Sequence, residues 1–472
     1  VNANVEIGGD VIVTKNNFAF GTTGSSNLTH TVKGNIQVNG TDALIDLNPT
    51  SSVSASVVIN LEGDLIGTAG TIKSTDDGCG IAFTNTVIQN INVADAVPFN
   101  NINCYVRNGA TVQLYDNNLK LNSNSKLTVE NGGTFNFNWD TDNTTPLMIV
   151  NGASGSNLFT SLDGSVLKIT HLSGLVKNTA SAGNVQLSVS NKTFSQLATF
   201  WYIGKADQFT GDAVSTGSTG KQLIVDLANN SLQLRPSNSL AFSNNTTISA
   251  TGGKLDIRKG QFIESETEYV TACSGTLYMA QGTLYKIVKG NSAYTDSDDI
   301  PRMSGVGAGS FPYVLTGGTI ELAGSGPNNA FQRLRSDNAS YNYVKVKFSG
   351  SNTYLTDYKN PSSQVEIDSA LIITGTAVVD CFTGGSGVAA SFVGNGGLFM
   401  DGGRLRIKKL NNANPELSGI NMPYSLTGGT IEFYGSGDAQ QQLIRGTYGS
   451  PSNKISYYNI DINAGAANYD DA

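Results

Sequence analysis

Residues 312–322 read PYVLTGGTIEL and residues 423–433 read PYSLTGGTIEF, so nearly the same stretch returns after 111 positions. Each copy then continues into Gly-Ser-Gly, at 324–326 and at 435–437. Self-similarity at a fixed spacing is typical of repeat proteins, in which one supersecondary unit is stacked many times. These two stretches therefore predict a repeat architecture.

Weaker copies extend the repeat towards the N-terminus. With them, the repeat markers lie near residues 80–91, 199–211, 315–326 and 426–437, and successive copies are 119, 120 and 111 residues apart. One large apolar residue marks each copy, namely Phe83, Tyr202, Leu322 and Phe433. The sequence thus predicts about four degenerate repeats of 111–120 residues.

Within each copy, apolar and polar residues alternate over short runs, as in residues 255–257 (LDI) and 405–407 (LRI). A period of two places successive side chains on opposite faces of a β-strand. Glycine and asparagine separate the runs, as at residues 402–403, and these residues supply the positive φ that a tight turn needs. No segment keeps a helical period over three turns, so short strands and turns are expected throughout.

Two architectures suit such a unit: a string of β-sandwich domains, or one solenoid in which every repeat supplies several coils. The sequence has only 11 prolines, and no Pro-rich or charged linker separates the copies, whereas independent domains usually meet at such linkers. We therefore expect one continuous repeat body over residues 1–472, a right-handed parallel β-solenoid, with an irregular insertion at 288–311. Tandem β-sandwich domains are the alternative.

The composition limits the classes of partner. Charged residues make up 14% of the chain and the net charge is −8, with no run of Lys and Arg. Nucleic acid and anionic membranes attract basic surfaces, so neither is expected as a partner. No apolar run approaches the ~18 residues that a membrane-spanning helix needs. The chain begins without Met and its last copy stops in mid-unit, so further repeats of the same polypeptide or a stacked second copy are expected at its ends.

The last repeat resembles that of a known family. Residues 426–437 (LTGGTIEFYGSG) are followed by the glutamines at 440–442 and by the strand-like segment YYNIDIN at 457–463. This order is similar to the repeat of large secreted β-strand-repeat proteins of Bacteroidota, in which GTxxFxGxxxQxI precedes YxNLxIN. Residues 198–211, which include Gln208, fit the same template.

The resemblance implies a secreted or cell-surface protein, exported by the type IX secretion pathway and related to gliding-motility adhesins. It implies an extracellular, non-catalytic stalk or filament segment, with the secretion machinery or surface glycans as partners. Residues 368–370 (Asp-Ser-Ala) also resemble the short O-glycosylation acceptor of exported Bacteroidota proteins, so Ser369 is a candidate glycan carrier. An ordinary serine at a strand edge is the alternative.

Catalytic chemistry has little support in the sequence. The two histidines, His30 and His171, lie far apart, and no nucleophile-elbow sequence accompanies either. The alternative to a structural protein is a glycan-binding or polysaccharide-cleaving β-helix, whose acids would be Glu264, Glu266 and Glu268. On one strand these alternate carboxylates would lie ~7 Å apart, within the range of a glycosidase pair. A solvated outer face is the plainer interpretation, so we expect no catalytic residues and no enzyme.

Two further candidate sites depend on single short segments. Asp296, Asp298 and Asp299 lie in an oxygen-rich loop of the kind that binds calcium, the one cofactor that the sequence suggests. Trp201 and Tyr202 could offer ring faces to a glycan. The alternatives are a plain polar loop for the acids and core packing for the rings.

The cysteines raise the question of a disulfide. Cys79 and Cys104 are 25 residues apart, which is close to the length of one β-helix coil. They would then lie on adjacent coils, at a separation that a disulfide tolerates. A disulfide and two buried free thiols are both compatible with this spacing.

Overall fold

The computed structural model shows a chain built almost entirely of β-strands, with one short 3-10 helix, η1 (Val189–Asn191), among the residues that it describes. The chain divides into two compact units, unit 1 (Val1–Asn238) and unit 2 (Ser239–Ala472). The described residues are 3–21, 27–49, 55–97, 99–142, 144–152, 155–214, 218–219, 222–234, 240–243, 253–273, 276–290, 299–300, 313–326, 331–334, 342–355, 365–381, 392–408, 423–434 and 454–463.

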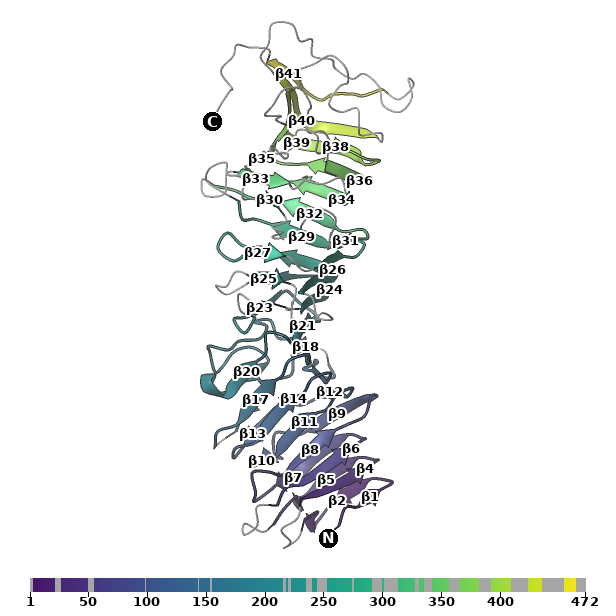
Figure 1. Cartoon of the computed structure of the whole chain (residues 1–472), viewed down its shortest axis with the longest axis vertical. Coiled ribbons are helices and arrows are strands. Elements are labelled where there is room, and N and C mark those ends of the chain that lie inside the picture. The colour runs from purple at the N-terminus through teal and green to yellow at the C-terminus, as the bar shows by residue number, and fades with distance from the viewer. Residues whose placement is uncertain are drawn as a thin grey trace. The chain divides into compact units, whose positions relative to one another are not determined.

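The architecture is a parallel β-solenoid of about 12 turns, which confirms the predicted fold. Every strand pair that the described residues form is parallel, and within each unit the coils are stacked one on the next (Figure 1). A residue pairs with another that lies 22 to 36 positions later in the sequence. Sandwich domains are built from antiparallel strands, so the alternative of tandem sandwiches is excluded. One continuous body over 1–472 stays a prediction.

Unit 1 has three columns of strands. Face 1 contains β1 (Glu6–Ile7), β4 (Leu28–Val32), β6 (Val57–Leu61), β8 (Gly80–Phe83), β11 (Asn103–Val106), β14 (Lys126–Val129), β17 (Leu158–Ser161) and β20 (Lys192–Phe194). Face 2 contains β2 (Val11–Val13), β9 (Ile88–Val93), β12 (Thr111–Leu114), β15 (Thr134–Asn136), β18 (Val166–Ile169) and β21 (Thr199–Tyr202). Face 3 contains β3 (Asn16–Ala19), β10 (Phe99–Asn100), β13 (Leu119–Asn122), β16 (Ile149–Asn151) and β19 (Val185–Gln186).

Longer strands of unit 1 connect these columns. β5 (Ile36–Asp46) and β7 (Leu65–Lys73) pair on both face 2 and face 3, and β24 (Gln222–Gln233) pairs with β21 and with β22 (Gln208–Phe209). β23 (Ser218–Thr219) lies between β22 and β24 in the chain.

Unit 2 has the same stacking with more strands that run through a corner. Face 4 contains β26 (Lys254–Ile263), β29 (Leu284–Ile287), β32 (Thr319–Leu322), β34 (Asn342–Phe348), β36 (Val365–Ile373) and the first halves of β39 (Gly397–Lys408) and β40 (Tyr424–Tyr434). Face 5 contains β30 (Asp299–Ile300), β33 (Phe331–Leu334), β35 (Thr353–Leu355), β37 (Val378–Cys381), the second halves of β39 and β40, and β41 (Ile460–Asn463). The other strands are β25 (Leu240–Ser243), β27 (Val270–Cys273), β28 (Thr276–Met279), β31 (Tyr313–Leu315) and β38 (Phe392–Val393).

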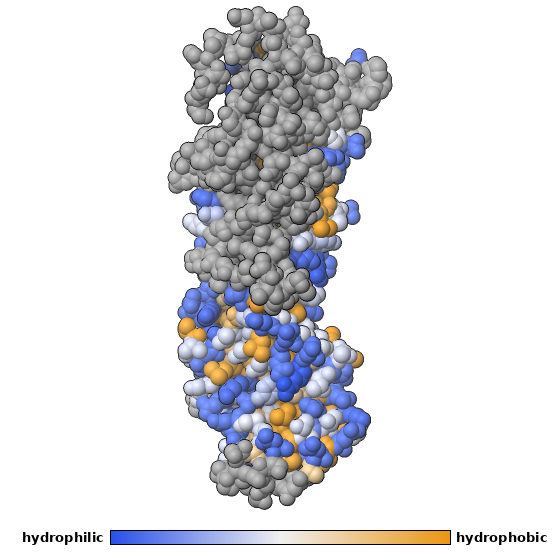
Figure 2. Space-filling view, in the orientation of Figure 1, coloured by the Kyte–Doolittle hydropathy of each residue, from blue (hydrophilic) through white to orange (hydrophobic). Residues whose placement is uncertain are grey.

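The alternation of residues along each strand fills the interior. Val112, Phe135, Leu167 and Phe200 occupy one position in four successive coils of face 2, and all four side chains are fully buried. Each such burial contributes about 1.5–3 kcal/mol. On the side of unit 1 that Figure 2 shows, hydrophobic patches are small and are separated by hydrophilic residues. The apolar residues of the short alternating runs thus form the core that the sequence predicted.

The Gly-Gly pair of the repeat lets a strand turn a corner. Gly428 and Gly429 lie in the middle of β40, in a stretch where its pairing with β39 shifts register. Gly429 has a φ of +78°, and a Cβ atom there would lie 2.4 Å from the carbonyl oxygen of Gly402 in the neighbouring coil. Only glycine fits such a conformation and such a close approach. The pair therefore carries one strand from face 4 to face 5.

A buried glutamine follows the repeat marker and makes a fixed set of hydrogen bonds. The Nε2 atom of Gln208 donates to the carbonyl oxygens of Ile169 and His171, at 3.4 and 2.9 Å. Its Oε1 atom accepts a hydrogen bond from the N–H of Gly204, at 2.9 Å. Because Gln208 is 1% exposed, no water replaces these bonds from outside. We call this arrangement the glutamine latch.

Gln89 and Gln332 form the same latch in the first and third copies. In each copy, one carbonyl belongs to the residue that pairs with the repeat marker in the preceding coil, and the other belongs to the residue two positions later. The N–H group always belongs to the residue two positions after the marker. The glutamines of the fourth copy, at 440–442, lie outside the described residues. The sequence repeat therefore reflects a device that fastens one coil to the preceding one.

The repeat does not return to the same face of the solenoid. Phe83 lies in register with Phe194 four coils later on face 1, and the marker Tyr202 follows eight residues further, on face 2. In unit 2, four coils separate Leu322 from Leu426, and the fourth marker follows seven residues further, on face 5. In both units, one repeat therefore spans four coils and one additional face.

Candidate functional site

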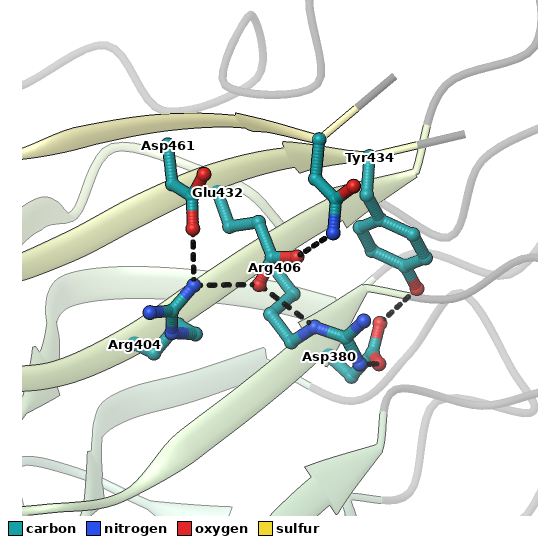
Figure 3. Close-up of polar contacts among 7 residues, drawn as sticks. Asp380, Arg404, Arg406, Glu432, Tyr434 and Asp461 are labelled. Carbon is teal, nitrogen blue, oxygen red and sulfur yellow. Dashed lines mark hydrogen bonds and ion pairs between the residues drawn. The ribbon is translucent and has the colours of Figure 1, made fainter. Parts of the chain in front are cut away.

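A network of charged side chains lies on the outer side of face 5 (Figure 3). Arg404 and Arg406 of β39 point outward, because the residues that alternate with them are buried in the core. The register pairs Arg406 with Asp380 of β37 in one neighbouring coil and with Glu432 of β40 in the other. Glu432 pairs in turn with Asp461 of β41. Four successive coils thus contribute one charged residue each to a single column.

The two arginines bridge the acids of neighbouring coils. The Nη1 atom of Arg406 lies 2.5 Å from Oδ2 of Asp380, and its Nε atom lies 3.0 Å from Oε2 of Glu432. The Nη1 atom of Arg404 lies 2.9 Å from the same oxygen of Glu432 and 2.8 Å from Oδ2 of Asp461. Asp461 and Glu432 together raise the pKa of Arg404 above its ordinary value. The network therefore holds its positive charges at every physiological pH.

The same network leaves its carboxylates little capacity for proton transfer. Asp380 and Glu432 are only 6% and 4% exposed. Asp380 also accepts a hydrogen bond from the Tyr434 hydroxyl, and the Arg406 guanidinium lies 4.3 Å from the centre of the Tyr434 ring. Burial opposes the charge of Arg406, but the neighbouring groups, Asp380 first among them, outweigh it and raise its pKa. A general acid or base must reach a substrate with a transferable proton, so this arrangement suits a clamp between coils.

Sequence reasoning did not identify this network. Residues 404–408 were informative only as an alternating strand, and nothing in the sequence states which acidic residue of another coil lies opposite Arg404 or Arg406. The available signal was opposite charge at outward positions of neighbouring strands, with Glu432 following 26 residues after Arg406. A known coil length would have converted that spacing into a contact.

The three glutamates considered as a catalytic row do not share a strand. Residues 264–269 form a turn after β26, so the predicted period-2 strand is wrong here. Glu264 is buried, and its Oε1 atom accepts a hydrogen bond from the Tyr285 hydroxyl at 2.6 Å. Glu266 is exposed, and Glu268 lies on the turn itself. Because the chain leaves the sheet before these residues, the predicted row of carboxylates does not form.

The predicted calcium loop is only partly covered. Asp296 and Asp298 lie outside the described residues, and Asp299 is described by its backbone alone, in β30. Among the described residues, no three His, Cys, Asp or Glu side chains come together as a metal site would require. Calcium binding at 296–299 stays a prediction.

Cys79 and Cys104 lie in adjacent coils and are both buried free thiols. The register shows why they do not face each other: Cys104 pairs with Ile81, so Cys79 is two residues out of step. The Sγ atom of Cys79 instead accepts a hydrogen bond from the N–H of Val57, at 3.3 Å. Burial raises the pKa of both thiols, and that of Cys104 to about 12.

These thiols should resist modification in the folded chain. The thiolate is the reactive form, and a rise of three pKa units lowers its population about 1,000-fold at neutral pH, before any effect of burial on access. We expect a disulfide-exchange reagent to label Cys104 in a Cys273→Ser, Cys381→Ser background only after unfolding by urea. Thr86→Cys, at an exposed position, is the control and should react at once. Rapid labelling of the native chain at Cys104 would contradict the buried placement.

Both histidines are structural residues. The Nδ1 atom of His30 accepts a hydrogen bond from the N–H of Val5 at 3.1 Å, and its Nε2 atom lies 3.0 Å from the carbonyl oxygen of Phe20, so Nε2 carries the proton. The Nδ1 atom of His171 accepts a hydrogen bond from the N–H of Ser173 at 3.0 Å. Burial lowers the pKa of both imidazoles. Each ring therefore accepts from the backbone in its neutral form.

The chain should accordingly lose stability in weak acid. A histidine with a lowered folded pKa binds its proton more readily when unfolded, so its contribution is complete above pH ~6.5 and declines as the pH falls from there through the folded pKa. A difference of one pKa unit corresponds to about 1.4 kcal/mol. We expect the Tm to fall between pH 7 and pH 5, and the double variant His30→Gln, His171→Gln to show a weaker pH dependence. Equal slopes for the two proteins would refute the assignment.

The two aromatic residues considered as glycan contacts point to opposite sides of β21. Tyr202 is fully buried, and its hydroxyl donates to the carbonyl oxygen of Thr210 at 2.6 Å. The prediction that Tyr202 contacts a glycan is therefore wrong, because the ring belongs to the core. Trp201 points outward, and the Lys168 ammonium lies 4.6 Å from its ring centre. Trp201 stays a candidate.

Ser369 lies at an irregularity in face 4. It is exposed, within β36, where two residues of that strand, Asp368 and Ser369, stand opposite a single residue of β34. A bulge of this kind bends the strand and re-aims its side chains. The position is accessible to a modifying enzyme, and modification itself stays a prediction.

A buried lysine is a further feature that the sequence did not reveal. Lys192 of β20 is 2% exposed, and its Nζ atom donates to the carbonyl oxygens of Val176, Thr179 and Val185, at 2.7, 2.7 and 3.3 Å. Burial lowers the pKa of this amine. Its contacts hold the long connection between β18 and β20 against the solenoid, which is a structural role.

Comparison with known proteins finds no matching family model, no matching curated protein and no matching solved structure. The described residues include no helix that is long and apolar enough to cross a membrane. Function is therefore inferred from the contacts of the chain itself.

Proposed function

We propose that the chain is a structural segment of an extracellular stalk or filament and has no catalytic role. The observation that carries this proposal is the use of its polar side chains. Three glutamine latches and the ion network of face 5 each connect one coil to the next. Such contacts add stability coil by coil, as in other solenoids, and support a long rigid body.

The cellular setting rests on the resemblance of residues 426–463 to the Bacteroidota repeat. We propose export by the type IX secretion pathway, a location on the cell surface or outside the cell, and kinship with gliding-motility adhesins. Partners would be further repeats of the same polypeptide or a stacked copy, the secretion machinery, and surface glycans. A parallel β-solenoid is compatible with each of these roles.

Two experiments test the proposal. In the source organism, an antibody against residues 80–210 should label intact cells, and external protease should remove that label. Loss of the export pathway should retain the protein inside, and an exclusively intracellular signal would refute the surface location. Against the enzymatic alternative, incubation with a panel of acidic and neutral polysaccharides should release no product. Turnover that Glu266→Gln abolishes would overturn the structural role.

The Ser369 proposal has a direct measurement. Intact-mass analysis of protein purified from the source organism should show a glycan on the peptide that contains Ser369, and Ser369→Ala should lack it. Ser425→Ala is a suitable control, because it removes a partly exposed serine from another strand of face 4. An unmodified native peptide would end the idea.

A further inference from the structure

Face 2 of unit 1 presents an almost uncharged outer surface over five successive coils. The outward residues of β9, β12, β15, β18 and β21 form two columns, and all of them are partly or largely exposed. One column is Ile88, Thr111, Thr134, Val166 and Thr199, and the other is Asn90, Gln113, Asn136, Lys168 and Trp201. Lys168 carries the single charge among these ten side chains, in a chain whose net charge is −8.

The amides of the second column form a ladder. The Nδ2 atom of Asn90 donates to Oδ2 of Asp64 at 3.0 Å, Nε2 of Gln113 donates to Oδ1 of Asn90 at 2.8 Å, and Nδ2 of Asn136 donates to Oε1 of Gln113 at 3.3 Å. A side-chain amide has two donor hydrogens, and its oxygen accepts two hydrogen bonds. The ladder uses one donor and one acceptor of Asn90 and of Gln113. Each of these residues therefore keeps one donor and one acceptor for another molecule.

The rest of the surface adds hydroxyl groups and an aromatic ring. Thr111 and Thr134 lie beside the amide ladder in successive coils, and Thr199 lies beside Trp201. The indole ring of Trp201 offers apolar area, and the Lys168 ammonium near that ring is the one strong charge. Alternating polar groups around an aromatic residue match the hydroxyl groups and C–H faces of a sugar.

We propose that face 2 of unit 1 binds a neutral polysaccharide that lies along the stack of coils. Coils repeat every ~4.8 Å, which is close to the length of one sugar unit, so successive rungs meet successive sugars. The near absence of charge matches an uncharged polymer and gives an acidic one little attraction. A flat sheet face has no deep pocket, so the affinity sums over several weak contacts. This binding is a property additional to the structural role.

The test compares equal substitutions on two faces. Thr111→Arg with Thr134→Arg places bulky side chains on face 2, and Thr128→Arg with Thr160→Arg places them on face 1, also in successive coils at outward positions. The probes are mixed-linkage β-glucan, xylan and dextran as neutral polymers, and alginate and polygalacturonate as acidic ones. In affinity electrophoresis, the unchanged chain should bind at least one neutral polymer. The face 2 variant should lose about tenfold or more in affinity, and the face 1 variant less than about twofold.

A second measurement does not depend on the arginine variants folding. Binding of the same neutral polymer should change the tryptophan fluorescence of the unchanged chain, and Trp201→Phe should remove most of that change. The proposal fails if no neutral polymer binds, if acidic polymers bind more tightly, or if both arginine variants lose equal affinity. It also fails if light scattering shows that face 2 instead mediates association between copies of the chain. None of these failures affects the structural role, which rests on contacts between coils.

Discussion

Replacing Gln208 with leucine should lower the free energy of unfolding of unit 1 by roughly 2–4 kcal/mol. Leucine keeps most of the buried volume but removes all three hydrogen bonds of the latch. The N–H of Gly204 and the carbonyl oxygens of Ile169 and His171 would then be buried without this partner, and each such group costs about 1–3 kcal/mol. The affected coils should therefore open more often than their neighbours.

Urea unfolding and amide hydrogen exchange measure this effect. Exchange should accelerate most at Gly204 and in β18 and β21, because the latch joins those coils. Gln37→Leu is the matched control: this glutamine is partly exposed, and the printed contact of its side chain is one hydrogen bond from Asn39. Gln208→Glu should also destabilise, because an ionised carboxylate would face two carbonyl oxygens. A Gln208→Leu chain as stable as the Gln37→Leu chain would show that the latch is incidental.

Replacing Arg406 with methionine should destabilise face 5 by about 3–5 kcal/mol. Arg406 lies between Asp380 and Glu432, and both carboxylates are buried. Removal of the guanidinium leaves those charges in a place where water cannot solvate them fully, although Arg404 still contacts Glu432. A buried charge that has lost its partner costs far more than the pair contributed when intact.

Hydrogen exchange in β37, β39 and β40 should report this loss locally. The triple variant Arg406→Met, Asp380→Asn, Glu432→Gln should recover much of the stability, because it removes the orphaned charges together with their partner. Lys33→Met is the control, since Lys33 and Glu6 form an exposed ion pair on face 1, and exposed pairs contribute little. Equal stability of the single and triple variants at face 5 would contradict the clamp.

The strand pattern and the repeat could be predicted because both depend on local rules. Alternation of apolar and polar residues defined the short strands, and the Gly-Gly pair of residues 428–429 marked a turn that only glycine accommodates. The same rule failed at Glu264, Glu266 and Glu268. Alternation there reflects a turn whose first glutamate is held inside by Tyr285, and a pattern of period two cannot distinguish these cases.

The candidate site was the least predictable feature, because it depends on which coils lie opposite each other. Tyr202 was grouped with Trp201 as an exposed aromatic, yet adjacent residues of one strand point to opposite sides, and the core took Tyr202. Cys79 and Cys104 have the spacing of one coil, but a register offset of two residues keeps them apart. Spacing in sequence gave the coil, and only the register gave the contact.

The sequence by itself determined the architecture: a repeat of 111–120 residues, short strands, glycine turns and an apolar side to every strand, which together favour a parallel solenoid. Only the tertiary structure decided that one repeat spans four coils and one further face, that the glutamine after each marker is a latch, and that Arg406 lies between two acids. The physical reason is that coils differ in length, from 22 to 36 residues. Side chains on the same column are therefore joined by backbone pairing between coils, and no fixed interval in the sequence records that pairing.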